Sequence, residues 1–116
     1  MIIEYLTTSR RSSDLVKRII LENVLNKHND MLCFYIIFVL HKGMYYITDE
    51  GETLFDINPD MKEPNKEISE IIKKYRISFA NGEIFTYADK NELYKKECIF
   101  INALTEINNL CIKKFF

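Results

Sequence analysis

The feature that most constrains the fold is an uninterrupted run of ten apolar residues from Met31 to Leu40. Residues Tyr35 to Val39 are aromatic or β-branched, and turn-forming residues bound the run, which favours a strand over a buried helix. Side chains of a strand point alternately to the two faces of its sheet. We therefore expect a central strand, covered from both sides or by helices on one side and a partner on the other.

The residues after this run complete a first hairpin. Lys42-Gly43 predicts a tight reversal, because glycine adopts the positive φ that such turns need. Met44 to Thr48 is the expected return strand, and the acidic turn Asp49-Glu50-Gly51-Glu52 follows it. Thr53 to Ile57 then fits either a short strand or one helical turn, before a loop over residues 58–64.

A second hairpin is predicted around Asn81-Gly82, the preferred pair for a two-residue type I′ turn. The flanking strands are residues 76–80 and 83–88. In this register Phe79 faces Ile84, and Ile77 faces Thr86. The remaining aromatic residues of the second strand, Phe85 and Tyr87, then point to the other side and form an exposed aromatic edge unless something covers them.

Residues 15–25 carry the first helical signal. Apolar side chains recur there at three- and four-residue spacing, which is typical of an amphipathic helix. Ser12 and Ser13 are candidate N-caps, and Asp14 is placed to favour the helix dipole. We therefore predict a first helix that ends in the turn-forming residues 26–30.

Two further helices are expected later in the chain. Pro64 suits a helix start, and the apolar residues from Ile68 to Tyr75 mark one face of the helix that follows. Asp89 and Glu92 form a capping box, and an apolar stripe continues from there to Cys111. Lysines near the end of this last helix lie where the helix dipole favours cations.

These elements predict a single α+β domain over residues 1–116, with the order α-β-β-α-β-β-α. Two antiparallel hairpins would form one sheet packed by three helices. Residues 1–11 fit either a short strand or a flexible arm, because apolar residues at the start give way to a polar stretch.

Composition excludes several classes of function. A formal net charge of −1 argues against a protein that coats nucleic acid, since that affinity comes from Lys and Arg neutralising phosphates. Cys33, Cys98 and Cys111 are widely spaced, which favours buried free cysteines in a reducing cytosol over a disulfide scaffold or a zinc site. No cofactor motif is present. The longest apolar run is half the length of a membrane-spanning helix, so we expect a cytoplasmic protein.

The acidic turn is the main candidate for chemistry. Its carboxylates, with Asp56 downstream and Asp30 before the first strand, are open to three interpretations: an exposed turn, a partner-binding patch or a site for a hard cation. A nuclease of the restriction type would also need a lysine on the adjacent strand, which residues 48–51 do not supply.

Other candidate sites are weaker. Cys33 and His41 would share a strand face as a nucleophile pair, but no cation or helix start next to Cys33 lowers its pKa. His28 and His41 otherwise fit exposed turns. The basic residues Arg10, Arg11 and Arg18 suit a solvated surface better than a nucleic-acid contact.

The segment Tyr46 to Leu54 resembles the signature of a small bacterial and prophage-borne domain family of unknown function. In that family a hydrophobic strand ends in Thr-Asp-Asp-Gly, and Thr48-Asp49-Glu50-Gly51 matches it with Glu50 in place of the second Asp. The likeness covers residues 13–112. Matching positions outside the motif are Asp30, residues 75–77, Glu83, residues 102–104, Ile107 and Leu110.

The resemblance implies a product of mobile elements, often encoded beside defence or anti-defence genes. We therefore expect a phage-encoded, non-enzymatic protein that binds and inhibits a bacterial defence complex, of the anti-CRISPR kind. Its expected contact residues, Asp49, Glu50, Glu52 and Asp56, would imitate phosphates toward a basic groove.

Two other functions stay open. One is a divalent-metal nuclease or hydrolase using Asp30, Asp49 and Glu50, and the other is a nucleic-acid-binding regulator or antitoxin using the three arginines named above. A homodimer is a further option. It would form through Phe85, Tyr87 and the Phe115-Phe116 tail.

Overall fold

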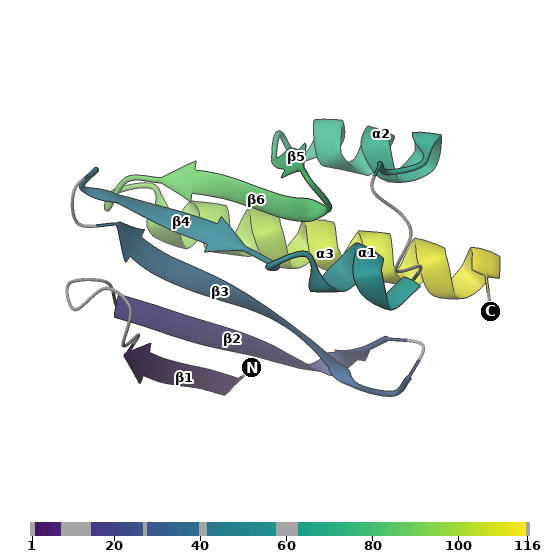
Figure 1. Ribbon diagram of the computed structural model, residues 1–116, viewed down its shortest axis with the longest axis horizontal. Coiled ribbons are helices and arrows are strands. Elements are labelled where there is room, and N and C mark those ends of the chain that lie inside the picture. The colour runs from purple at the N-terminus through teal and green to yellow at the C-terminus, as the bar shows by residue number, and fades with distance from the viewer. Residues whose placement is uncertain (1, 8–14, 27, 40–41, 58–62, 116) are drawn as a thin grey trace.

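The computed structural model has one six-stranded antiparallel sheet and three helices (Figure 1). It describes residues 2–7, 15–26, 28–39, 42–57 and 63–115. The strands and helices, in chain order, are β1 (Ile2–Thr7), β2 (Leu15–Leu25), β3 (Met31–Val39), β4 (Met44–Thr48), α1 (Glu52–Ile57), α2 (Lys66–Lys74), β5 (Ser78–Ala80), β6 (Glu83–Ala88) and α3 (Leu93–Phe115).

The strands lie in the order β1-β2-β3-β4-β6-β5. Helix α3 packs across one face of this sheet and contacts β2, β4 and β6 (Figure 1). Helix α2 packs beside α3 and β5, and α1 contacts α3 and β6. The α+β class and the single sheet are therefore confirmed, but the predicted element order is wrong because the chain begins with strands.

Strand β3 is central, as predicted, with β2 and β4 as neighbours. Leu32, Phe34 and Ile36 are buried on the side of α3, where the Phe34 ring lies 5.2 Å from that of Phe100 between centroids. The alternate residues Cys33 and Tyr35 are only half-buried. Helix α3 thus covers one face of β3, while the other face keeps part of its surface exposed.

The predicted first helix is wrong, because residues 15–25 form β2. Its backbone is paired on both edges, with β1 on one side and β3 on the other. Ile19 and Leu21 are only 1% and 6% exposed and point to α3, where Lys17 forms an ion pair with Glu97 at 3.4 Å. The apolar residues therefore also fit a two-residue period, and pairing with β3 decides between the two. The predicted caps at residues 12–14 lie outside the described residues.

The end of β2 is irregular. Its register with β3 shifts between Leu21 and Leu25, which places a bulge there. The side-chain amide of Asn108 on α3 donates to the Leu25 carbonyl at 2.8 Å. Bulge and helix are therefore joined by a hydrogen bond, which explains why a polar residue lies in the buried stripe of α3.

The N-terminal residues form a strand, one of the two structures expected for them. β1 pairs with β2 from Ile2↔Ile20 to Thr7↔Leu15 and forms one edge of the sheet. Residues 8–11 of the predicted arm lie outside the described residues.

The second hairpin is confirmed. Asn81 and Gly82 have φ values of 52° and 82°, as a type I′ turn requires, and Phe79 pairs with Ile84. β5 begins at Ser78, one residue after the predicted partner of Thr86. β6 pairs with β4, which joins the two hairpins into one sheet.

The later helices are also confirmed, with Asn65 rather than Pro64 as the N-cap of α2. Its side-chain oxygen accepts from the Ile68 N–H at 2.8 Å, and the Asp89 carboxylate accepts from the Glu92 N–H at 2.8 Å. Residues 52–57 are helical, one of the two structures expected there. Within the described residues, no helix is long and apolar enough to cross a membrane.

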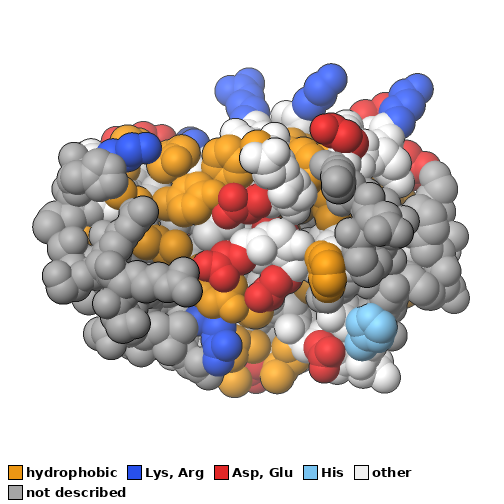
Figure 2. All heavy atoms as spheres, in the orientation of Figure 1, with side chains coloured by type: hydrophobic (Ala, Val, Ile, Leu, Met, Phe, Trp, Pro, Cys, Tyr) orange, Lys and Arg blue, Asp and Glu red, His pale blue; other side chains and the backbone are white. Residues whose placement is uncertain are grey.

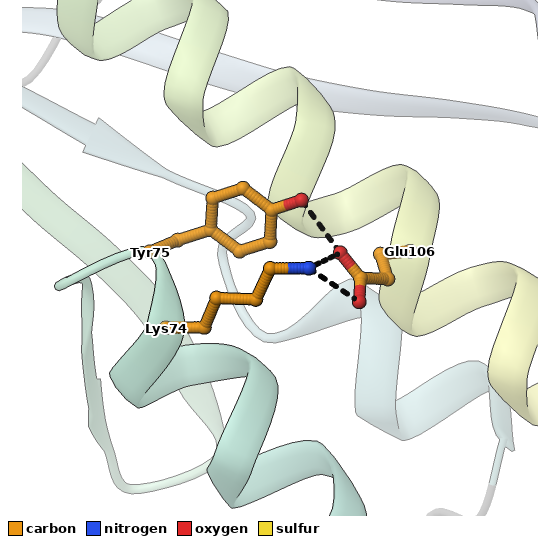
Figure 3. A network of polar contacts seen from close by, with 3 residues as sticks. All are labelled: Lys74, Tyr75 and Glu106. Atoms are coloured by element: carbon orange, nitrogen blue, oxygen red, sulfur yellow. Dashed lines mark hydrogen bonds and ion pairs between the residues drawn. The ribbon is translucent and has the colours of Figure 1, made fainter.

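A polar network joins α2 to α3 at the surface (Figure 3). The Lys74 ammonium donates to both Glu106 oxygens at 3.1 and 3.2 Å, and the Tyr75 hydroxyl donates to Glu106 at 2.5 Å. The Tyr75 hydrogen bond, followed by those of Lys74, lowers the pKa of Glu106. Because these side chains are largely exposed, water screens the pair, and we assign it a positional role only.

The strand assignment of β2 predicts unequal effects at adjacent positions. Ile19→Ala should lower the free energy of unfolding by about 2–4 kcal/mol, because it leaves a cavity under α3. Ile20→Ala should cost clearly less, because Ile20 points to the other face and is half-buried. Urea denaturation measures both, and equal losses would contradict the strand.

Candidate functional site

Asp49, the first residue of the acidic turn, is buried, with 0% of its surface exposed. One carboxylate oxygen accepts from the N–H groups of Gly51 at 2.8 Å and Ile84 at 2.9 Å, and the other accepts from the Thr53 N–H at 3.2 Å. These donors come from the turn, from α1 and from β6. Asp49 therefore ties the end of β4 to the neighbouring hairpin.

Backbone hydrogen bonds reinforce this connection. The Asp49 N–H donates to the Ile84 carbonyl at 3.1 Å, and the Glu52 N–H donates to the Asp49 carbonyl at 3.1 Å. Glu50 and Gly51 both have positive φ, 54° and 79°, so the chain turns through two left-handed residues. Burial raises the pKa of Asp49 above its ordinary value, while the backbone donors oppose that rise.

The acidic turn is thus divided between two roles. Glu50 and Glu52 are exposed, as a contact surface requires, whereas Asp49 faces the interior. Asp56 lies in α1, but its side chain is outside the described residues. The prediction that these residues contact a partner stays a prediction for Glu50, Glu52 and Asp56; for Asp49 the structure shows a structural role.

Glu83 joins Glu50 and Glu52 on the face of the sheet opposite α3. Burial raises the pKa of Glu50, and the negative charges of Glu52, Glu83 and Asp49 raise it further. Glu83 accepts a short hydrogen bond from the Thr48 hydroxyl and another from Tyr46. Sequence reasoning did not include Glu83 as a site residue, although its alternation with Phe85 and Tyr87 places it on their face.

Glu52 contacts the same face through β3. The Tyr35 hydroxyl donates to one of its oxygens at 3.4 Å, and the Cys33 thiol donates to the other at 3.5 Å. Burial, then the charge of Glu52, raises the pKa of Cys33 to about 11. Cys33 is therefore a neutral thiol at physiological pH rather than an activated nucleophile, and its proposed partner His41 lies outside the described residues.

Aromatic rings occupy the rest of this face. The centroid of Tyr46 lies 5.6 Å from Phe85 and 5.1 Å from Tyr87, and Phe85 lies 6.1 Å from Tyr87. The Lys42 ammonium lies 5.4 Å from the centroid of the Tyr87 ring, within the range of a cation–π contact. Tyr87 is 39% exposed.

We call this surface the open face. Figure 2 shows it, with acidic side chains gathered at its centre and hydrophobic side chains beside them. Its residues are Cys33, Tyr35 and Ile37 of β3, Tyr46 of β4, Glu50 and Glu52 of the acidic turn, and Glu83, Phe85 and Tyr87 of β6. Thr48 is on the same side of β4 but is buried beneath them.

The structure does not bring Asp30 and Asp49 together. Asp30 is exposed in the β2–β3 turn, whereas Asp49 follows the residue that pairs with Tyr35. At a rise of about 3.3 Å per residue, roughly 13 Å of strand separates them. Among the described residues, no group of three or more His, Cys, Asp and Glu side chains could hold a metal ion.

Of the three basic candidates, the structure describes Arg18, which already contacts other side chains. Arg18 hydrogen-bonds Tyr35 and acts electrostatically on Cys33, so it lies beside these two residues of β3. Arg10 and Arg11 lie outside the described residues. His28 is exposed in the β2–β3 turn, as predicted.

A shallow groove of ≈ 300 Å³ lies between α2 and α3. Ile71 and Leu110 supply its apolar part, and Glu67, Glu70 and Glu106 its acidic part. Lys74 and Tyr75 already donate hydrogen bonds to the Glu106 carboxylate (Figure 3). The open face carries aromatic side chains, which the described lining of this groove lacks, so we take the open face as the candidate functional site.

The role of Asp49 is testable by its stability. Asp49→Ala should lower the free energy of unfolding by about 3 kcal/mol, because it leaves two buried N–H groups and one partly buried N–H group without an acceptor. Asp49→Asn should cost less, since its carbonyl oxygen can still accept from Gly51 and Ile84. Glu52→Ala is the matched exposed control, and a loss as large as that of Asp49→Ala would contradict the assignment.

The pKa of Glu50 generates a prediction with a defined sign. The pKa of Glu50 is higher in the folded protein than in the unfolded chain, so its protonated form favours folding. This contribution to stability is complete below the unfolded-state pKa and is lost as pH rises through the folded-state pKa. Glu50→Gln should therefore raise Tm at pH 7, because it removes repulsion, and the gain over wild type should shrink toward pH 4. Calorimetry over this range measures it. A gain that grows on acidification would contradict the repulsion.

Comparison with known proteins identifies a family. A family model described as "Domain of unknown function DUF1828" matches residues 23–107, which include the open face from β3 to β6. No curated protein and no solved structure matches the chain. The match covers most of the chain, and the protein therefore belongs to the DUF1828 family of uncharacterised domains.

Proposed function

We propose that this domain is a non-enzymatic protein-binding module, which docks through its open face on a bacterial defence complex and inhibits or modulates it. The observation that carries the proposal is the asymmetry of β3. Helix α3 covers Leu32, Phe34 and Ile36, whereas aromatic and acidic side chains surround Cys33 and Tyr35 on the other face. Partly exposed aromatic rings of this kind are enriched among the residues that dominate binding energy at protein interfaces.

The charge of the open face favours a protein partner over nucleic acid. Glu50, Glu52 and Glu83 present carboxylates at its centre, which repel phosphate groups. Arg18 hydrogen-bonds Tyr35 and lies beside Cys33. A regulator or antitoxin that binds DNA through this face would bring the phosphate backbone of the DNA against these carboxylates.

The contacts of Asp49 and Cys33 count against the enzymatic alternative. A metal-dependent nuclease using Asp30, Asp49 and Glu50 would need free oxygens on Asp49, but both accept backbone hydrogen bonds. Asp49 is also 0% exposed, so a cation would have to enter the interior to reach it. The Cys33 thiol is held neutral by burial and by Glu52.

The resemblance to a mobile-element family supports the narrower part of the proposal. The genomic context that it implies, beside defence and anti-defence genes, favours a protein that binds and modulates another macromolecule. The acidic centre of the open face is compatible with a mimic of nucleic-acid phosphates. An inhibitor of the anti-CRISPR kind would use it to occupy a basic groove of a defence nuclease.

A capture experiment with a functional readout tests the proposal. The tagged full chain, incubated with lysate of a bacterium that carries a defence nuclease, should retain a nuclease subunit in stoichiometric amount and lower its cleavage rate. Tyr87→Ser should reduce both, because it removes an exposed ring from the open face. Tyr94→Ser, on α3 with 79% of the residue exposed, is the matched control and should change neither.

Two results would contradict the proposal. The first is the absence of a stoichiometric protein partner, and the second is a partner whose retention is the same for Tyr87→Ser and wild type. Circular dichroism of both variants establishes that they are folded.

A further inference from the structure

We infer that the partner segment seated on the open face inserts an arginine or lysine among Glu50, Glu52 and Glu83, and lays apolar side chains on Tyr46, Phe85 and Tyr87. This inference rests on the proposed function and specifies the chemistry of the partner at the same site. It commits to a cationic and apolar protein segment.

The three carboxylates come from different elements and converge on one side of the sheet. Glu50 belongs to the turn after β4, Glu52 begins α1, and Glu83 begins β6. Thr48 links two of them, because its hydroxyl donates to Glu83 and accepts from the Glu50 N–H at 2.8 Å. The negative charges of Glu52 and Glu83 also act on Glu50. A cation at this point removes that repulsion, so charge complementarity favours a basic side chain.

Neighbouring hydroxyl groups orient two of these carboxylates. Glu83 accepts from Thr48 and Tyr46, and Glu52 accepts from Tyr35 at 3.4 Å. A carboxylate has about four acceptor positions, so each keeps capacity for a further donor. A guanidinium presents its donors in a planar fork that suits oriented carboxylates, which makes arginine the better fit.

The aromatic part of the open face begins directly beside the carboxylates. Glu83, Phe85 and Tyr87 alternate along β6, so their side chains share a face at intervals of roughly 7 Å. The Tyr46 ring contacts both Phe85 and Tyr87. A partner should therefore present apolar groups about 7 and 14 Å from its cation.

The chain itself shows that a ring on this face accepts a cation. The Lys42 ammonium lies 5.4 Å from the Tyr87 ring centroid, at the end of the face away from the acidic turn. Hydrophobic side chains lie beside the acidic centre in Figure 2. The acidic part of the face therefore suits the charged head of an amphipathic segment, and the aromatic part suits its apolar body.

Panning of a random twelve-residue peptide library on the immobilised full chain tests the inference. We expect enriched peptides that combine Arg or Lys with aromatic or aliphatic residues. Fluorescence polarisation of one such peptide should show about tenfold weaker binding to Glu83→Gln, and weaker binding as salt rises. Tyr87→Ser should also weaken it. Glu92→Gln and Tyr94→Ser, both exposed and on or near α3, should leave it unchanged.

The outcomes separate this inference from the proposed function. Peptides that lose affinity for Tyr87→Ser but carry no cationic bias and ignore Glu83→Gln would overturn the inference and leave the proposed function standing. Peptides that bind all face variants equally would contradict both. Failure to enrich any peptide would overturn the inference alone, because the lysate experiment tests the proposed function independently.

Discussion

The hydrogen bonds of the Asp49 carboxylate hold the two hairpins in their relative positions. A single buried side chain joins the turn after β4, the start of α1 and the first residues of β6. The sheet is continuous at this point because β6 pairs with β4, although α1, α2 and β5 come between them in the chain. Glu50, Glu52 and Glu83 depend on this connection for their mutual approach. The geometry of the candidate site is therefore a consequence of a structural residue.

Local patterns predicted the parts of the fold that local chemistry decides. The Asn81-Gly82 turn, the return strand after Gly43 and the Asp89 cap of α3 depend on a few adjacent residues. Residues 15–25 differ because their apolar positions fit both periods. Pairing with β1 and β3, partners separate in the sequence, decides that they form a strand. Propensity and spacing do not contain that information.

The same distinction applies to the candidate site. The sequence identified the acidic turn, but not that Asp49 points inward while Glu50 and Glu52 stay exposed. The burial of Asp49 depends on a hydrogen bond from the N–H of Ile84, a residue of the other hairpin. Glu83 was missed for the same reason, because only the pairing of β4 with β6 brings it near the turn. The aromatic pair Phe85 and Tyr87 was found because strand alternation alone places both on one face.

The bond between Asn108 and Leu25 has a consequence for the order in which the protein is made. It joins positions 83 residues apart, and the helix that supplies Asn108 also covers the buried side of β2 and β4. On the ribosome, the four N-terminal strands emerge well before α3 exists, with the apolar side of their sheet facing water. Completion of the core therefore waits until α3 has been made, and the nascent sheet depends until then on shielding from aggregation.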